Sequence, residues 1–141
     1  TFHGRDVFAA VAGHIAAGVE VSRCGSRCPT WVRLSWPEPT WSSSTRIAGE
    51  VAHIDRFGNL ISNIPAEMLG ATGSSQPRVA LAARELGPLR TTYGEVEAGA
   101  WVAYVGSAGL LEIAVRDASA AATGAGLGDS VRVRWDAEDG S

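Results

Sequence analysis

The sequence of 141 residues contains no lysine, only two cysteines and one methionine, and no long uninterrupted apolar run. All 12 basic residues are arginines, they are spread along the chain, and the net charge is −3, so we expect no nucleic-acid partner. No apolar run approaches the roughly 20 residues that cross a bilayer, and the start has no basic segment followed by an apolar signal core. We therefore expect a cytoplasmic protein without a membrane partner.

Cysteines and histidines are too few and too scattered to predict a metal site. Cys24 and Cys28 lie four residues apart, but zinc needs further thiol or imidazole ligands, and His3, His14 and His53 show no ligand spacing. A disulfide across the turn between the cysteines stays open, whereas a cytoplasmic compartment favours free thiols.

The first 18 residues predict one helix. Apolar residues recur there at helical spacing, namely Val7, Phe8, Val11 and Ile15. Gly18 stands where a helix would stop, so we expect the helix to cover residues 5–17. His3 then lies just before its N-terminus, where backbone amides are exposed and an imidazole can polarise a water or an anion. An ordinary loop histidine explains the same position.

Residues 19–46 have the composition of a linker, with Ser, Pro, Trp and Arg but no sustained period. Pro37 and Pro39 restrict the backbone and disfavour helix, so we expect an extended crossing between two structural layers. The tryptophans of this segment are expected to cover core: Trp31, Trp36 and Trp41.

From Ile47 onward the sequence predicts short strands. Apart from a hairpin around Gly58, the expected strands are 78–82, 86–92, 101–105, 110–115 and 130–135. Residues 65–69 allow one turn of helix at most. Six or seven short strands with turn signals indicate a mainly β domain, built as a closed or sandwiched antiparallel sheet.

The hairpin around Gly58 gathers the most polar groups. Asp55, Phe57 and Asn59 surround the glycine, which permits a backbone conformation that other residues resist. Such a turn mouth can hold a ligand. A well-capped hairpin, in which Asp55 and Asn59 only bond to nearby backbone amides, is the simpler interpretation of this stretch by itself.

Five segments taken together resemble one known family. They are TFHGRDVF (1–8), IDRFGN (54–59), YGEV (93–96), GSAGLLEIA (106–114) and GDSV (128–131). Their order and spacing are similar to those of the S-adenosyl-L-methionine (SAM) hydroxide adenosyltransferases, also called SAM hydrolases, which are relatives of fluorinase and chlorinase. The likeness covers nearly the whole chain.

The resemblance implies an architecture. Residues 1–18 would be the last helix of an N-terminal α/β domain, 19–46 the linker, 47–135 a C-terminal β-barrel-like domain and 136–141 a tail. Since the chain begins with Thr1, we expect it to be the C-terminal part of something longer. Family members form homotrimers whose sites lie between the N-terminal domain of one subunit and the C-terminal domain of its neighbour.

The resemblance also implies a reaction. Family hydrolases direct water at the 5′ carbon of the substrate ribose and release methionine, giving adenosine. A sulfonium is already an excellent leaving group, so the enzyme mainly orients the substrate, excludes bulk water and positions one water in line. No metal or redox cofactor is required, and SAM is the substrate.

Site residues follow by similarity. His3 would orient or activate the water, together with an Asp and an Arg of the N-terminal domain. The substrate contacts implied for this chain are Asp55 to the methionine ammonium, Phe57 as a wall, Asn59 to the adenine edge, Tyr93 against adenine, Ser107 to the methionine moiety, and Glu112 with the backbone near Val115 on the adenosine side. A strand glutamate is also commonly just a solvated residue.

Some residues of this chain differ from those at the same positions of the family pattern. Ala108 stands where halogenases have an arginine, and Gly4 stands where fluorinase has a halide-binding serine, so water is favoured over halide. Arg116 and Asp117 replace an asparagine and a small residue. Because the ribose-binding carboxylate would lie in the N-terminal domain, we expect no turnover from this chain alone. Two alternatives stay open: a non-catalytic adenine-nucleoside-binding module, and a structural trimerisation β-domain.

Overall fold

The computed structural model describes residues 2–33, 36–70 and 76–135, and it divides into two compact units, Thr1–Ser35 and Trp36–Ser141. The first unit is helical. A π-helical turn at Gly4–Phe8 continues directly into α1 (Ala9–Ala16), and a 3-10 turn follows at Val21–Cys24. This confirms the helix expected over residues 5–17. Neither helical segment contains a buried residue, and residues 2–33 as a whole contribute none to a core.

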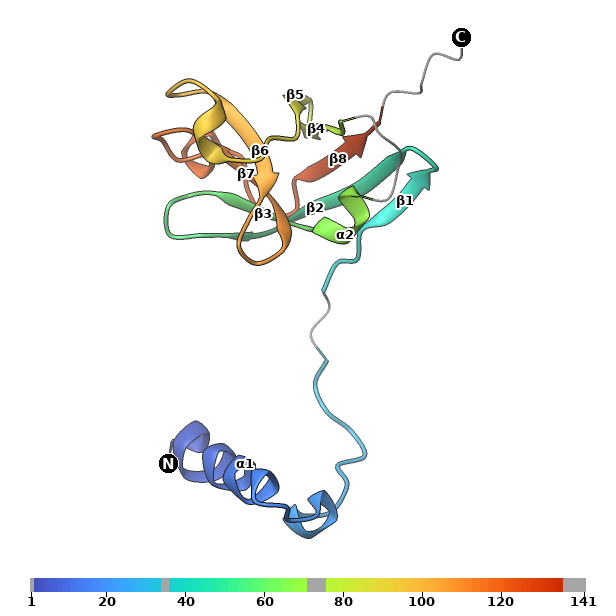
Figure 1. Ribbon diagram of the computed structural model, residues 1–141, viewed down its shortest axis with the longest axis vertical. Coiled ribbons are helices and arrows are strands. Elements are labelled where there is room, and N and C mark those ends of the chain that lie inside the picture. Colours follow the sequence, from blue (N-terminus) through green and yellow to red (C-terminus); the bar gives the residue numbers. More distant parts are fainter. Residues whose placement is uncertain (1, 34–35, 71–75, 136–141) are drawn as a thin grey trace. The chain divides into compact units, whose positions relative to one another are not determined.

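The second unit is an antiparallel sheet of eight strands (Figure 1). The strands are β1 (Thr40–Ser43), β2 (Arg46–Ile54), β3 (Leu60–Pro65), β4 (Arg78–Leu81), β5 (Arg84–Pro88), β6 (Trp101–Val105), β7 (Leu110–Val115) and β8 (Ser130–Arg134). Short helices stand at Ala66–Leu69 (α2), Tyr93–Glu95 and Ala121–Thr123. The strand order is β5-β4-β8-β2-β3-β7-β6, with β1 added on β2.

The sheet nearly closes on itself. Just after β5, the Arg90 backbone N–H donates to the carbonyl of Ala103 on β6 at 2.8 Å, which links the two ends of the strand order. The mainly β, barrel-like antiparallel class expected from the sequence is therefore confirmed, with a helix at the N-terminus. No helix among the described residues is long and apolar enough to span a membrane.

Two details of the expected fold differ. Eight strands are present instead of six or seven, because β1 lies within residues 19–46, which we expected to be a linker. The expected strand 86–92 is displaced to Arg84–Pro88, since the chain leaves the sheet after Pro88. The tail expected at 136–141 lies outside the described residues.

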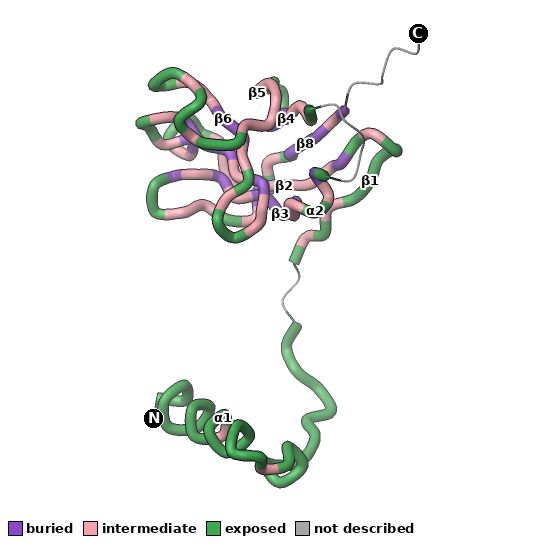
Figure 2. The backbone as a smooth tube through the Cα atoms, in the orientation of Figure 1, coloured by how far each residue is buried: buried purple, intermediate pink, exposed green. Residues whose placement is uncertain are grey.

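The core is one hydrophobic cluster to which β2, β3, β4, β6, β7 and β8 contribute buried residues (Figure 2). Trp135 is 5% exposed and stacks on Trp41 with ring centroids 5.8 Å apart, so Trp41 does cover core. The same expectation was wrong for Trp31 and Trp36, which are 60% and 56% exposed. The Trp31 ring instead carries the guanidinium of Arg33, 4.8 Å from its centroid.

A buried asparagine ties the start of this unit to the sheet. Asn63 is 3% exposed; its side-chain oxygen accepts the Glu50 N–H at 2.8 Å, and its side-chain N–H donates to the Pro37 carbonyl at 2.9 Å. Gly49 has to be a glycine here, because a Cβ would lie 2.4 Å from the Asn63 oxygen. The segment before β1 is thereby held against β2 and β3.

Candidate functional site

The turn between β2 and β3 is closed by its own carboxylate. Asp55 Oδ1 accepts the backbone N–H groups of Phe57 and Asn59 at 2.8 and 2.9 Å, and Oδ2 accepts the Asn59 side-chain N–H at 3.0 Å. The hydrogen bonds of Asp55 are thus those of a well-capped hairpin, except that Asn59 bonds to a carboxylate rather than to a backbone amide. Asp55 Oδ2 and the side-chain oxygen of Asn59, Oδ1, can each accept a further hydrogen bond.

Hydrogen bonding also sets the ionisation of Asp55. Desolvation pushes the pKa of this carboxyl upward, but the hydrogen bonds from the Asn59 and Phe57 backbones and the Asn59 side chain outweigh it, so the pKa lies below its ordinary value. Asp55 therefore carries a full negative charge at neutral pH, and it suits an ammonium group.

Gly58 fixes the position of this turn. Its φ is +83°, and a Cβ there would lie 2.0 Å from the Ser119 hydroxyl oxygen. Its carbonyl accepts the N–H of Ala121 at 3.0 Å. The turn therefore packs directly on the segment between β7 and β8. Phe57 projects from it with 64% exposure, and the Arg56 guanidinium lies 4.7 Å from its ring centroid.

A row of three residues, Ile61, Glu112 and Tyr104, crosses the outer face of β3, β7 and β6, and the last two of them are polar. Glu112 pairs in register with Ile61 on one side and Tyr104 on the other, and the Tyr104 hydroxyl donates to Glu112 Oε2 at 2.9 Å. Burial, and then this contact with Glu112, raise the pKa of Tyr104, with a smaller contribution from the Asp55 charge. The phenol therefore stays protonated as a donor. A Cβ on Gly106 would collide with the Glu112 carboxylate.

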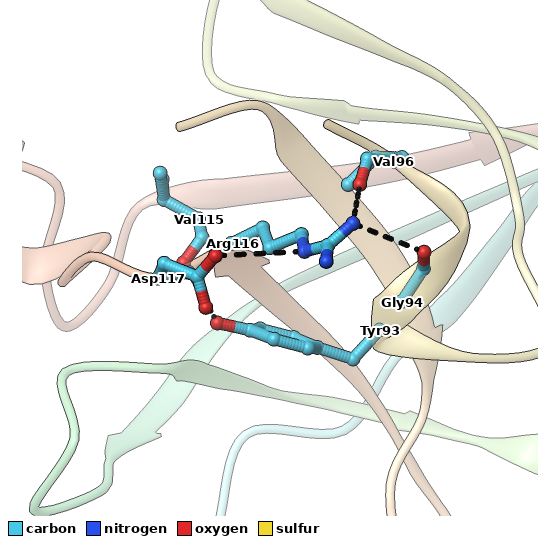
Figure 3. A network of polar contacts seen from close by, with 6 residues as sticks. All are labelled: Tyr93, Gly94, Val96, Val115, Arg116 and Asp117. Carbon is cyan, nitrogen blue, oxygen red and sulfur yellow. Dashed lines mark hydrogen bonds and ion pairs between the residues drawn. The ribbon is translucent and has the colours of Figure 1, made fainter. Parts of the chain in front are cut away.

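Tyr93 is held beside this row by a second network (Figure 3). Its ring meets Tyr104 edge-on, with centroids 6.3 Å apart. Its hydroxyl donates to the Val115 carbonyl at 3.4 Å and accepts the Asp117 backbone N–H. Arg116 fixes the same loop by donating to the carbonyls of Gly94 and Val96.

An ion pair and a further hydrogen bond stabilise the same corner, where Asp117 has a left-handed backbone conformation. Arg116 and Asp117 form an ion pair at 3.6 Å, and Asp117 has a φ of +59°. The Val115 carbonyl accepts a second hydrogen bond from the Ala118 N–H at 3.1 Å, so this carbonyl is already used twice within the chain.

The two turns lie at opposite ends of β3. That strand begins directly after Asn59 and ends at Pro65, which pairs with Leu110, directly after the turn at residues 106–109. Six extended residues span roughly 16–20 Å. Ser107, on the second turn, is exposed and makes no hydrogen bond with any described residue. The structure therefore brings Asp55 to Asn59, and Tyr104 to both Glu112 and Tyr93, and it places the turn of Ser107 at the opposite end of β3 from the Asp55 turn.

His3 belongs to the other compact unit. It has helical φ and ψ at the N-cap of the first helical turn, it is exposed, and its side chain makes no cap hydrogen bond. Among residues 2–33, 36–70 and 76–135, no three His, Cys, Asp or Glu side chains are grouped so that they could hold a metal ion.

Sequence reasoning missed two residues that organise the site. Tyr104 was assigned no role, although Tyr104 and Glu112 each lie four residues from Ala108 in the turn, so the hairpin register pairs them. Arg116 was noted as a departure from the family but not as a clamp, because its two carbonyl partners lie about 20 residues earlier and no local pattern relates them.

Comparisons with known proteins identify the family of this chain. The family model of the SAM hydroxide adenosyltransferase C-terminal domain matches residues 49–132. An (R)-S-adenosyl-L-methionine hydrolase of Thermus thermophilus is 42% identical over 120 residues, which cover 85% of this chain and 43% of that protein. A fluorinase of Nocardia brasiliensis is 34% identical over 131 residues, covering 86% of this chain and 43% of that protein.

A solved structure extends the likeness to three dimensions. The crystal structure of an uncharacterized conserved protein from Thermotoga maritima matches with a TM-score of 0.69 and 33% identity, over 95% of this chain and 52% of that one. The chain thus spans about half the length of the relatives that it matches. It belongs to the SAM hydroxide adenosyltransferase family, of which it contains the C-terminal domain.

Proposed function

We propose that this chain supplies the C-terminal half of a SAM-hydrolysing site, in which water attacks the ribose 5′ carbon and methionine leaves. The observation that carries the proposal is the outer face of β7 and β6 in a chain of this family, where the Tyr104–Glu112 pair adjoins Tyr93 and the charge of Asp55 acts on Tyr104. No metal or redox cofactor takes part in the proposed reaction.

Asp55 and Asn59, which are hydrogen-bonded to each other, contact two different polar groups of the substrate in this proposal. The free acceptor capacity of Asp55 Oδ2 receives the methionine ammonium, and the lowered pKa of Asp55 keeps this partner charged. The side-chain N–H of Asn59 donates to Asp55, which leaves the side-chain oxygen of Asn59 to accept a hydrogen bond from the adenine amino group. Phe57 is the exposed wall of this end of the site.

The aromatic and hairpin residues orient the nucleoside. Tyr93 offers a ring whose direction is fixed at its hydroxyl, which suits packing against adenine. Glu112 lines the adenosine side with Tyr104 holding one of its oxygens, and the Val115 backbone lies beside it. Ser107 has no partner among the described residues, and in the proposal its hydroxyl contacts the methionine moiety.

Catalysis then depends on positioning. In-line attack needs one ordered water and exclusion of the rest, and the sulfonium leaves without a proton donor. His3 has the water-orienting role in this proposal, because an imidazole nitrogen can accept a hydrogen bond from a water molecule. Ala108 and Gly4, in place of the arginine and serine of halogenases, support water as the nucleophile.

Isotope labelling tests the reaction. We expect this chain alone to form no adenosine, and a chimera carrying the N-terminal half of the Thermus thermophilus relative to form it from SAM. In water enriched in ¹⁸O, mass spectrometry should find the label in the adenosine 5′-hydroxyl. Unlabelled adenosine, or an equal rate in the Asp55→Ala chimera, would contradict the proposed chemistry or the proposed site.

Trimeric assembly and a cytoplasmic location stay predictions from the family resemblance and the sequence. Sedimentation of the chimera tests the first, since we expect a species of three chains. If the chimera is trimeric and folded but binds no nucleoside in calorimetry, the structural trimerisation role is the better description. If the chimera binds nucleoside without turnover, and His3→Ala leaves the binding affinity unchanged, the non-catalytic binding module is the better description.

A further inference from the structure

Four of the chain's arginines gather on one face of the sheet, away from the nucleoside site. They extend from three adjacent strands: Arg46 on β2, Arg132 and Arg134 on β8, and Arg78 on β4. Arg134 lies directly opposite Arg46 on one side and opposite Arg78 on the other, so three arginines form one row across the sheet. Like charges directly opposite one another destabilise a sheet, so this row is costly when nothing neutralises it.

A pocket lies at this row. It has a volume of about 250 Å³, and all four arginines line it together with Ser42 and Glu85. Arg132 lies between two small residues on the neighbouring strands, Ala48 and Ala80, which leave space on both sides of its aliphatic chain.

The pocket keeps a strong positive charge. Its lining contains four guanidinium groups and one carboxylate among the described residues, so the balance is +3. Glu85 lies 3.8 Å from Arg134, and Arg132 donates to the Ala82 carbonyl at 2.6 Å. Arg46 and Arg78 make no ion pair or side-chain hydrogen bond with any described residue. Guanidinium groups do not lose their proton at any physiological pH, so this charge is permanent.

We propose that this arginine pocket binds a small multivalent phosphate anion of the pyrophosphate class. Arginine forks match phosphate oxygens bidentately, and several converging forks neutralise a charge of two or three. The volume is below the roughly 300–1,000 Å³ of pockets for drug-sized ligands, which fits a diphosphate group better than a large molecule. A nucleic acid fits poorly, because the chain is net negative and its other arginines are dispersed.

This site is separate in the chain from the proposed nucleoside contacts. Arg46 is the first residue of β2 and Asp55 follows its last, so about nine extended residues, roughly 25–30 Å, lie between them. The phosphate proposal therefore does not depend on the SAM proposal, and either can fail alone.

Calorimetry on the 141-residue chain tests the pocket. Titration with pyrophosphate at constant ionic strength should give one site per chain. Arg78→Gln and Arg46→Gln should each weaken binding about tenfold or more, because a charge-assisted hydrogen-bonded pair is lost. The matched control is Arg84→Gln, which removes the same charge from β5, where Arg84 stacks on Trp101 outside the pocket lining. The affinity of Arg84→Gln for pyrophosphate should stay within about twofold of that of the unchanged chain.

Three further probes define the ligand. ADP binding more tightly than pyrophosphate would identify a nucleotide as the source of the diphosphate, whereas weaker binding of ADP would identify the free anion; both results support the site. Citrate tests whether phosphate geometry matters, and citrate binding as tightly as pyrophosphate would overturn the phosphate assignment.

Thermal unfolding gives a second readout. Without ligand, Arg46→Gln should keep or raise the melting temperature, since it relieves like-charge repulsion. Pyrophosphate should raise the melting temperature of the unchanged chain and of Arg84→Gln, but not of the Arg46→Gln, Arg78→Gln double variant. The proposal is overturned if millimolar pyrophosphate gives neither heat nor a thermal shift, or if the double variant responds like the unchanged chain.

Discussion

The two turns that flank β3 use their polar groups in opposite ways. The first, at residues 55–59, bonds its carboxylate to two backbone amides and one side-chain amide and packs its glycine on Ser119. The second, at residues 106–109, has an exposed serine without a described partner, and its Gly109 has no atom within 4 Å of a Cβ position. One turn is therefore stabilised from within, and the other leaves its hydroxyl available to a ligand.

The largest effect should come from the glycines of these turns. Gly58→Ala adds a Cβ at a φ of +83° and against the Ser119 hydroxyl, so backbone strain and overpacking should together cost about 2–4 kcal/mol in the free energy of unfolding. Gly109→Ala, with a φ of +72° and open space, should show the strain alone, about 1–2 kcal/mol. Urea denaturation measures both.

A second substitution separates the two causes. In the Gly58→Ala background, Ser119→Gly removes the colliding atoms and should restore part of the stability, whereas it should restore nothing in the Gly109→Ala background. Equal costs for the two glycine substitutions would show that the first turn is no more tightly packed than the second.

The side chains of the turns should differ next. Asp55→Ala removes three hydrogen bonds to a charged acceptor and should destabilise the chain by about 2 kcal/mol. Ser107→Ala removes no described contact and should change the free energy of unfolding by less than about 0.5 kcal/mol. In the chimera with the Thermus thermophilus half, both should weaken SAM binding. A stability loss in Ser107→Ala as large as in Asp55→Ala would remove the distinction between the turns.

The smallest effect should be a pH dependence that belongs to the first turn alone. Since the folded pKa of Asp55 lies below 3.8, its ordinary value, the ionised group stabilises the fold above that pH, and the contribution is lost as the pH falls through the folded pKa. Asp55→Asn should therefore lose less stability than the unchanged chain between about pH 5 and pH 2. Ser107→Ala should follow the unchanged chain, and coincident curves for Asp55→Asn and the unchanged chain would refute the role of the charge.

Local patterns account for much of what was predictable. Strands 101–105 and 110–115 match β6 and β7, because alternation and a glycine-bounded turn specify one hairpin. The helix at residues 5–17 follows from its apolar spacing. β1 escaped prediction because it is four exposed residues long and follows two prolines, so it has no alternation and depends on its pairing with β2.

The site was less accessible to sequence reasoning because its contacts are non-local. The carbonyls that Arg116 holds and the row of Arg46, Arg78 and Arg134 depend on strands that pair across long stretches of sequence. The capped Asp55 turn is the exception, since its hydrogen bonds all fall within five consecutive residues and follow from the known preferences of Asp and Asn in turns.

The central claim is that both turns, with the polar row between them, face one sulfonium nucleoside. Titration of the ¹⁵N-labelled 141-residue chain with millimolar SAM, followed by amide NMR shifts, tests this on the chain itself. The account predicts shifts at Asp55, Phe57 and Asn59, along the Tyr104–Glu112 row and at Ser107. Shifts confined to one turn, or located only outside this face, would contradict it.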